Sequence, residues 1–458
     1  MRTILKLVGC VVVLFLAYLF KKWTDYPDLP KLEEVWWGQD MPNNDTQPIL
    51  PFKIHISDEI LEDLNHRLKT TRPLPPSLEQ VNNTYGIHKD IVEDVLKYWR
   101  TEYNWREREK FLNQFPQFTV QIQGLRIHYL HVKPKLDAGS KVEVLPLLML
   151  HGWPGSIREF YEVIPELIKP KDGYNYVFEV IAPSLPGFGF SDATRKPGLG
   201  LAHVCVLFKN FMKRLGYQKY YIHGGDWGAV IAQTMATLFP EYLHGIHSTM
   251  CVTNAFSEFK LMLASWTPSL VIRKEHEEKV YPLLSTYEFL LKESGYFHLQ
   301  STKPDAVGVA LNESPIGLAA YILDKFISLT DPKYIHKPDG GLKEVFSYET
   351  LIDNLMIYWV TGTITSSMRI YAETFNKENQ GLLIDFVPTE VPTACTRFSH
   401  ELFYKPDCIL KDKFHNLVYT NDLEGGHFSA LQHPKLLAME IFKSVDKMIE
   451  EESIKAKK

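Results

Sequence analysis

Residues 220–239, YYIHGGDWGAVIAQTMATLF, decide the fold. The apolar run YYIHG predicts a buried strand, and AVIAQTMATLF predicts a helix that begins a few residues later. Glycines at positions 224, 225 and 228 permit a sharp turn between the two. This strand–turn–helix pattern is typical of a nucleophile elbow, and Asp226 stands where that motif usually carries serine. The alternative is an ordinary Gly-rich turn in which Asp226 caps the helix.

Short apolar runs on both sides of the elbow extend the pattern. The expected buried strands are VLPLLML (144–150), YVFEVIAP (176–183) and HGIHSTMCV (244–252). Apolar residues at helical spacing predict a helix over 203–215, which Gly216 ends. Strands that alternate with helices predict an α/β fold with a parallel, doubly wound sheet. Before it, TVQIQ and RIHYLHV predict an antiparallel hairpin that turns at Gly124.

The alternation breaks after residue 254. The next 130 or so residues have mostly helical periodicity, and strands resume only with VPTACTRF (391–398) and NLVYT (416–420). A helical insertion between two core strands predicts a cap over the active site. The chain is therefore divided into an N-terminal anchor (1–22), a wrapping and helical region (23–117), the first part of the core (118–254), the cap (255–388) and the second part of the core (389–458).

The composition excludes some classes of function. The chain has 458 residues, of which 45% are hydrophobic, and its net charge is −5, so a nucleic-acid partner is not expected. Residues 7–20 are uninterrupted apolar and have basic neighbours on both sides. We interpret them as a membrane anchor rather than a cleaved signal peptide or a buried helix. Because both flanks are basic, charge alone leaves the orientation open.

The five cysteines are scattered and odd in number, with no CxxC pair and no Cys/His ligand spacing. This pattern predicts neither a disulfide framework nor a metal site, and it favours a reducing compartment. No cofactor and no protein partner is indicated; the expected partners are a small apolar substrate, water and a membrane.

Three further segments supply partners for Asp226. His151–Gly155, HGWPG, follows the strand at 144–150, so the backbone N–H groups of Trp153 and Trp227 are expected to form an oxyanion hole. His427 lies on a Gly-rich loop after the last strand, where this order of residues places the general base. The acid that orients it should follow the strand at 391–398. Glu401 is nearest; Asp407 and Asp412 are the alternatives.

A carboxylate nucleophile changes the chemistry. A serine that attacked an alkyl carbon would form an ether, which water does not readily cleave, whereas Asp226 would form an ester that His427-activated water can hydrolyse. The oxyanion hole would serve this second step. The elbow therefore favours substitution at an sp³ carbon, with halide or an epoxide oxygen as the leaving group, over esterase chemistry.

The longer motifs resemble the microsomal epoxide hydrolases, and most closely the insect juvenile hormone epoxide hydrolases. They are HGWPGS (151–156), PSLPGFGFS (183–191), GGDWG (224–228), ESGYFHLQSTKPDAVG (293–308), TGTITSSMRIY (361–371) and GGHF (425–428). The resemblance implies an α/β-hydrolase fold, Asp226 as nucleophile, His427 as base, Glu401 as acid, and Tyr296 and Tyr371 as the pair that protonates the epoxide.

The same resemblance implies an anchor in the endoplasmic reticulum and a cytosolic catalytic body. Two other functions stay open at this point. A haloalkane dehalogenase would share the Asp-Trp elbow but would not need the two tyrosines as proton donors. A non-catalytic carrier of apolar ligands would not need the nucleophile and base.

Overall fold

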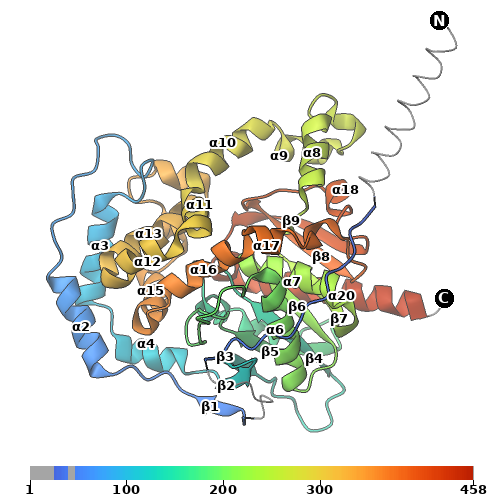
Figure 1. The fold of residues 1–458 in the computed structure, drawn as a ribbon, viewed down its shortest axis with the longest axis horizontal. Coiled ribbons are helices and arrows are strands. Elements are labelled where there is room, and N and C mark those ends of the chain that lie inside the picture. The colour runs from blue at the N-terminus through green and yellow to red at the C-terminus, as the bar shows by residue number, and fades with distance from the viewer. Residues whose placement is uncertain (1–24, 40–46, 457–458) are drawn as a thin grey trace, which may run out of the picture.

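The computed structural model describes residues 25–39 and 47–456 (Figure 1). The anchor expected at 1–22 lies outside the described residues. Within the described ranges, no helix combines the length and the apolar character that a membrane span requires.

The core is one mixed sheet of nine strands in the order β1-β2-β3-β5-β4-β6-β7-β8-β9. From β1 to β5 the neighbours are antiparallel, and from β5 through β4 to β9 they are parallel. The strands are β1 (Leu50–Phe52), β2 (Gln117–Ile122), β3 (Leu125–Val132), β4 (Glu143–Leu150), β5 (Tyr176–Pro183), β6 (Tyr220–Gly224), β7 (Leu243–Ser248), β8 (Thr393–His400) and β9 (Leu417–Gly426). This is the expected α/β-hydrolase architecture, with the predicted hairpin as β2–β3.

Helices pack against the sheet through their apolar sides. The predicted helix at 203–215 is α6 (Leu201–Arg214), which packs on α7 (Asp226–Leu238), and α7 lies against β4, β6 and β7. The C-terminal helix α20 (Pro434–Ala456) contacts β7 and β9. The elbow therefore joins the central strand β6 to a buried helix, which holds Asp226 firmly.

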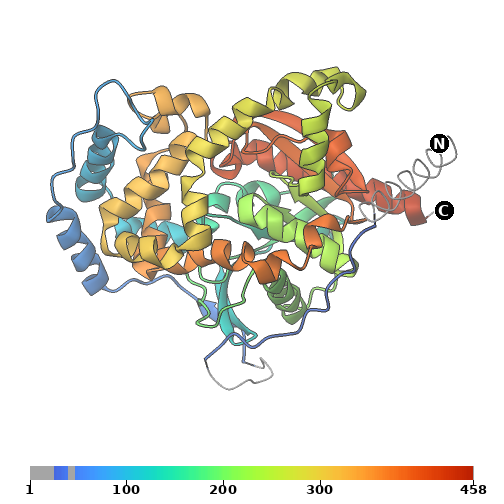
Figure 2. The same cartoon turned by 45° about the horizontal axis from the view of Figure 1, so that its top comes forward.

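The cap is inserted between β7 and β8. Its helices gather on one side of the sheet, in yellow and orange in Figures 1 and 2. They are α8 (Ala255–Ala264), α9 (Lys274–Val280), α10 (Leu283–Glu293), α11 (Gly295–Thr302), α12 (Pro304–Glu313), α13 (Pro315–Ser328), α14 (Leu342–Val345), α15 (Tyr348–Thr361), α16 (Ile364–Thr374) and α17 (Lys377–Gln380). The helical segment lies where a cap was predicted, and the exact domain boundaries stay predictions.

The N-terminal region covers two different parts of the molecule. Its extended segment lies on the β2–β3 turn, where the Trp37 N–H donates to the Gln123 carbonyl at 2.7 Å. A Cβ at Gly38 would meet the Gly124 carbonyl oxygen at 2.5 Å, so the WWG segment must end in glycine to pack this closely. By contrast, α2 (Asp58–Lys69) and α3 (Lys89–Thr101) pack on cap helix α13, beside the orange helices in Figure 2.

Cys251 and Cys395 form a disulfide, which the cysteine pattern of the sequence did not predict. Cys251 follows β7, and Cys395 lies in β8 directly beside the end of β7. The two are 144 residues apart in sequence because the whole cap is inserted between their strands. Spacing along the chain therefore gave no sign of a pairing that the neighbouring strands create.

Candidate active site

Asp226 lies on a strained turn. Its φ is +47°, a left-handed conformation that residues other than glycine seldom adopt. The surrounding glycines are required by close backbone contacts: a Cβ at Gly228 would overlap the Leu150 carbonyl, and one at Gly224 would overlap the backbone of residue 228. The turn lifts the Asp226 carboxylate above the carboxyl end of β6, where parallel strands present their functional residues.

The loop after β4 reaches the same carboxylate. Leu150 and Gly224 are register partners at the ends of β4 and β6, so the two loops leave the sheet side by side. The Trp153 N–H donates to Asp226 Oδ1 at 2.7 Å. A side chain at Gly152 would overlap that carboxylate. Trp227 directly follows Asp226 in sequence, and its part as a second N–H donor stays a prediction.

His427 and Glu401 complete a line of three side chains. The His427 Nδ1 is 2.7 Å from Glu401 Oε1, and the His427 Nε2 is 3.6 Å from Asp226 Oδ2. The backbone N–H of Leu402 also donates to Glu401 Oε1 at 2.7 Å and fixes the carboxylate. All three lie at the carboxyl ends of β6, β8 and β9, which are close together because β7 alone separates β6 from β8.

The two alternative acids are engaged elsewhere. Asp407 accepts from the Arg397 guanidinium at 2.6 Å, and Asp412 accepts from the Lys260 ammonium at 2.6 Å. Of the three carboxylates considered, the structure brings only Glu401 to His427.

The charge state of His427 depends on its two carboxylate neighbours. Burial disfavours the imidazolium, but Glu401 and Asp226 outweigh it and hold the pKa of His427 well above its ordinary value. In the resting site these two carboxylates therefore favour the protonated form of His427, whose Nε2 faces Asp226. His427 must lose this proton before it can act as a base. Its charge therefore changes during any reaction that uses it in this way.

The two cap tyrosines line the same cavity as Asp226. Tyr296 is the second residue of α11 and stacks on Trp153 with ring centroids 5.4 Å apart. Tyr371, in α16, contacts the Trp227 ring edge-on at 4.8 Å. The Tyr296 and Tyr371 rings are 6.3 Å apart. Burial, and then the charge of Asp226, raise the pKa of both phenols, so both keep their protons and remain hydrogen-bond donors.

A cavity of about 410 Å³ opens beside these residues and is lined by Asp226, Tyr296 and Tyr371. Most of its wall is apolar, and examples are Leu201, Val230, Met250, Leu290, Phe297 and Phe375. A drug-sized apolar molecule fits such a cavity and is held mainly by its exclusion from water. Among the described residues, no cluster of His, Cys, Asp or Glu side chains is placed to hold a metal ion.

Cap helix α15 holds the loop that carries Trp153, a role that the sequence motifs did not reveal. The Asn354 side-chain amide donates to the Pro154 carbonyl, and the Tyr358 hydroxyl donates to the Gly155 carbonyl, each at 2.7 Å. The Ser156 hydroxyl donates to Asn354 Oδ1 at 2.7 Å. These polar residues of α15 face the core because they bind backbone groups of this loop.

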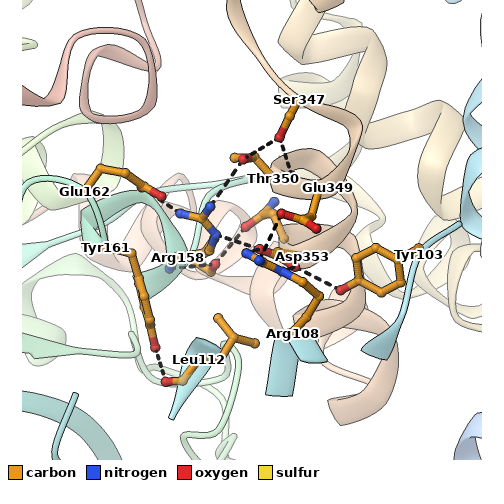
Figure 3. Close-up of polar contacts among 12 residues, drawn as sticks. Tyr103, Arg108, Leu112, Arg158, Tyr161, Glu162, Ser347, Glu349, Thr350 and Asp353 are labelled. Atoms are coloured by element: carbon orange, nitrogen blue, oxygen red, sulfur yellow. Dashed lines mark hydrogen bonds and ion pairs between the residues drawn. The ribbon is translucent and has the colours of Figure 1, made fainter. Parts of the chain in front are cut away.

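An ion-pair network extends the same connection (Figure 3). Asp353, which is fully buried, accepts from Arg158 of the core at 2.9 Å and from Arg108 of the N-terminal region at 2.6 Å. The Tyr103 hydroxyl also donates to Asp353, at 3.0 Å. One cap carboxylate thereby joins the N-terminal region, the core and the cap.

Comparisons with known proteins agree with this architecture. Residues 49–160 match the family described as the epoxide hydrolase N terminus, and residues 146–293 match the α/β hydrolase fold family. The chain is 47% identical to juvenile hormone epoxide hydrolase 1 of Ctenocephalides felis over 96% of this chain and 94% of that protein. It is 40% identical to epoxide hydrolase 1 of Sus scrofa, over 94% of this chain and 96% of that protein.

A solved structure is also similar over nearly the whole chain. The crystal structure of juvenile hormone epoxide hydrolase from the silkworm Bombyx mori superimposes with a TM-score of 0.89 at 46% identity. The match covers 92% of this chain and 100% of that one.

Proposed function

This chain belongs to the epoxide hydrolase family and is an epoxide hydrolase, and from that premise we propose that it opens apolar epoxides in two covalent steps. The observation that carries the mechanism is the position of the Asp226 carboxylate. One oxygen accepts from the Trp153 N–H, the other faces His427, and two cap tyrosines line the same cavity as Asp226.

In the first step, Asp226 Oδ2 attacks an epoxide carbon and forms an ester. Oδ1 is held by the Trp153 N–H, which leaves Oδ2 as the free nucleophilic atom. Tyr296 and Tyr371 donate hydrogen bonds to the epoxide oxygen, and one of them protonates it as the ring opens. The proton that His427 then gives up restores that tyrosine. Both phenols are protonated at neutral pH, as this role requires.

In the second step, His427 takes a proton from water, and the water oxygen attacks the ester carbonyl. Esterification removes the negative charge of Asp226, which is one of the two charges that raise the pKa of His427. The pKa of His427 therefore falls when the ester forms, and the imidazole becomes a base at the moment when one is needed. The oxyanion develops on Oδ1, where the Trp153 N–H already lies, with the Trp227 N–H as a second donor.

We propose juvenile hormone or a similar terpenoid epoxide as the substrate. The apolar cavity suits an extended hydrocarbon chain, and proteins named juvenile hormone epoxide hydrolase are among the relatives. We expect kcat/KM on a terpenoid epoxy ester to exceed that on styrene oxide at least tenfold. A preference for styrene oxide would instead assign the enzyme to the hydrolysis of foreign epoxides.

Two variants test the catalytic assignment against the alternatives. Asp226→Ala should abolish diol formation, and unchanged turnover would overturn the mechanism. Halide release from a chloroalkane without epoxide turnover would favour a dehalogenase, in which Tyr296→Phe would cost little. Tight binding of terpenoid epoxides by the wild type without turnover would support a carrier.

We further propose that residues 1–22 anchor the enzyme in the endoplasmic reticulum membrane with the catalytic body in the cytosol. The apolar run at 7–20 and the resemblance to microsomal epoxide hydrolases support this arrangement. The Cys251–Cys395 disulfide points the other way, because disulfides are rare in the cytosol. Protease treatment of intact microsomes distinguishes a cytosolic from a lumenal catalytic body. Digestion of the catalytic body supports the cytosolic side, and protection places it in the lumen.

A further inference from the structure

Glu159 is a carboxylic acid close to the nucleophile that the two-step mechanism above does not use. It lies in the short 3₁₀ helix η1 (Ile157–Phe160), which follows the loop that carries Trp153. Its Oε2 lies against that loop, 3.1 Å from where a Cβ on Gly155 would be. Among the described residues, no Lys, Arg or His side chain lies within ion-pair distance of it. An acid in this position without a cation needs another explanation.

A small cavity separates Glu159 from the catalytic residues. Its volume is about 20 Å³, and its polar lining consists of Glu159, Asp226, His427, His223, Thr249 and Ser429. A cavity needs a volume of about 10–15 Å³ and two to four polar partners to hold one water molecule, so this cavity suits a single water. Glu159 is half-buried and lines this cavity. The larger substrate cavity meets the small one at Asp226, which lines both.

The backbone around Glu159 is held rigidly. The Ser156 hydroxyl accepts from the Arg158 N–H at the start of η1, and Arg158 forms ion pairs with Asp353 and Glu162 (Figure 3). Glu159 is the next residue, and its side chain lines the small cavity beside Asp226. The two ion pairs of Arg158 therefore hold the segment from which Glu159 projects.

The surroundings favour the neutral form of Glu159. Burial raises the pKa of Glu159 to about 8; the attraction of protonated His427 and a hydrogen bond from the Gly152 backbone oppose this rise, and the charge of Asp226 adds to it. Tyr358 of α15 and His223 of β6 also face this region, and burial keeps His223 uncharged by lowering its pKa. A neutral carboxyl group has a carbonyl oxygen that accepts one hydrogen bond, and it adds no charge beside the oxyanion.

We propose that Glu159 holds the water that hydrolyses the Asp226 ester. The inference rests on the proposed two-step function. One water hydrogen goes to His427 Nε2, and the other is accepted by the Glu159 carbonyl oxygen, so a lone pair of the water oxygen points at the ester carbon. The oxygen adds to that carbon, and the tetrahedral intermediate expels the alkoxide of the diol. The alkoxide takes the proton from His427. The remaining water proton passes from the new Asp226 carboxylic acid to His427, so Asp226 is regenerated as a carboxylate that contains the water oxygen.

Rapid-quench kinetics separate the two steps in the full-length enzyme. Glu159→Leu should slow ester hydrolysis about 10- to 100-fold, because a misplaced reactant costs up to about 100-fold, while ester formation changes less than about threefold. The ester should then accumulate on Asp226 and be visible as a mass increase. Glu159→Gln keeps a neutral carbonyl acceptor and should restore hydrolysis to within about threefold at pH 7. Glu166→Leu, on the next helix, is the matched control and should match the wild type.

The pH profile adds a readout that a purely structural role would not move. Wild-type hydrolysis should slow on the alkaline side as Glu159 ionises, because the new negative charge opposes the oxyanion. Glu159→Gln should lose that inflection while it keeps the one that belongs to His427. Equal slowing of both steps in Glu159→Leu, or no slowing of either, would overturn the inference and leave the two-step mechanism standing. An absence of any ester in the wild type would overturn the two-step mechanism, and this inference with it.

Discussion

At the scale of single residues, the chemistry is set by which atoms face the two oxygens of Asp226. Oδ1 accepts a backbone N–H, and Oδ2 lies 3.6 Å from the His427 Nε2. Among the described residues, no arginine or lysine forms an ion pair with either oxygen of Asp226. The carboxylate is thus oriented but remains free to attack.

Tyr296 and Tyr371 should act on ring opening alone. Replacing either by Phe removes one donor to the epoxide oxygen and should slow ester formation about 10- to 100-fold; replacing both should cost at least about 1000-fold. Hydrolysis of the ester should be unchanged, as single-turnover measurements would show. Tyr321→Phe is the control, since Tyr321 also packs edge-on against Trp153, at 5.8 Å, but is not assigned to the epoxide. A slower second step in the Tyr296→Phe variant would contradict this division of roles.

Glu401 should influence the pH dependence of kcat through the pKa of His427. Its negative charge stabilises protonated His427 and so raises the pKa of His427. Glu401→Gln removes that charge, so the pKa of His427 should fall and the acidic limb of kcat should move to lower pH. The maximal rate should drop at least about 100-fold, because the imidazole loses its oriented partner. Asp412→Asn should leave the profile unchanged, and a shift of the acidic limb to higher pH would contradict the assignment of Glu401.

At the scale of elements, the site depends on how closely α7 approaches β4. Gly228 allows that approach, because a Cβ there would overlap the Leu150 carbonyl, which is backbone and cannot move aside. Gly228→Ala should therefore lower the free energy of unfolding by at least about 3 kcal/mol, measured by urea denaturation. Gly295→Ala has open space around its Cβ and should unfold like the wild type. Equal stability of all three proteins would contradict the packing described here.

Much of this arrangement is readable from the sequence for physical reasons. Apolar runs in the core become buried strands, so β4, β5, β6 and β7 are predictable, and the Gly-rich elbow needs its glycines for steric reasons. A carboxylate after β8 is predictable as the partner of the histidine, but the sequence leaves Asp407 and Asp412 beside Glu401, and only Glu401 contacts His427 among these three. The tyrosines are not predictable: among 23 tyrosines, only the resemblance to a family singles out two.

The remaining features depend on contacts between distant segments. The Cys251–Cys395 pair arises from neighbouring strands that the cap separates in sequence. The packing of α2 and α3 on the cap, rather than on the core, is not encoded in their amphipathic pattern, which fits either surface. Glu159 follows the HGWPG motif by only four residues, and its position after an oxyanion loop is the signal that could have marked it.

At the scale of the whole molecule, the N-terminal region, core and cap behave as one connected body. Asp353 of the cap joins Arg158 of the core and Arg108 of the N-terminal region, and it has no exposed surface (Figure 3). The same helix, α15, binds the loop that carries Trp153 through Asn354 and Tyr358. The position of the cap and the position of the Trp153 N–H are therefore coupled.

Asp353→Ala should disrupt this connection. It leaves Arg108 and Arg158 without their shared carboxylate and should cost about 3–5 kcal/mol of unfolding free energy, seen as a lower midpoint in thermal or urea unfolding. Glu313→Ala is the matched control, because its exposed pair with Arg67 also joins the N-terminal region to the cap. That pair is solvent-screened, so its loss should leave the midpoint nearly unchanged. A larger effect for Glu313→Ala than for Asp353→Ala would contradict the connection through Asp353.

The central claim is that Asp226 forms the covalent intermediate, and isotope labelling in a single turnover tests it most directly. With enzyme in excess over epoxide in water enriched in ¹⁸O, the water oxygen should enter the Asp226 carboxylate. The first diol should then carry no label, and peptide mass spectrometry should find the mass increase in the peptide that contains Asp226. Label in the first-turnover diol, with none in that peptide, would mean that water attacks the epoxide directly and would contradict the account.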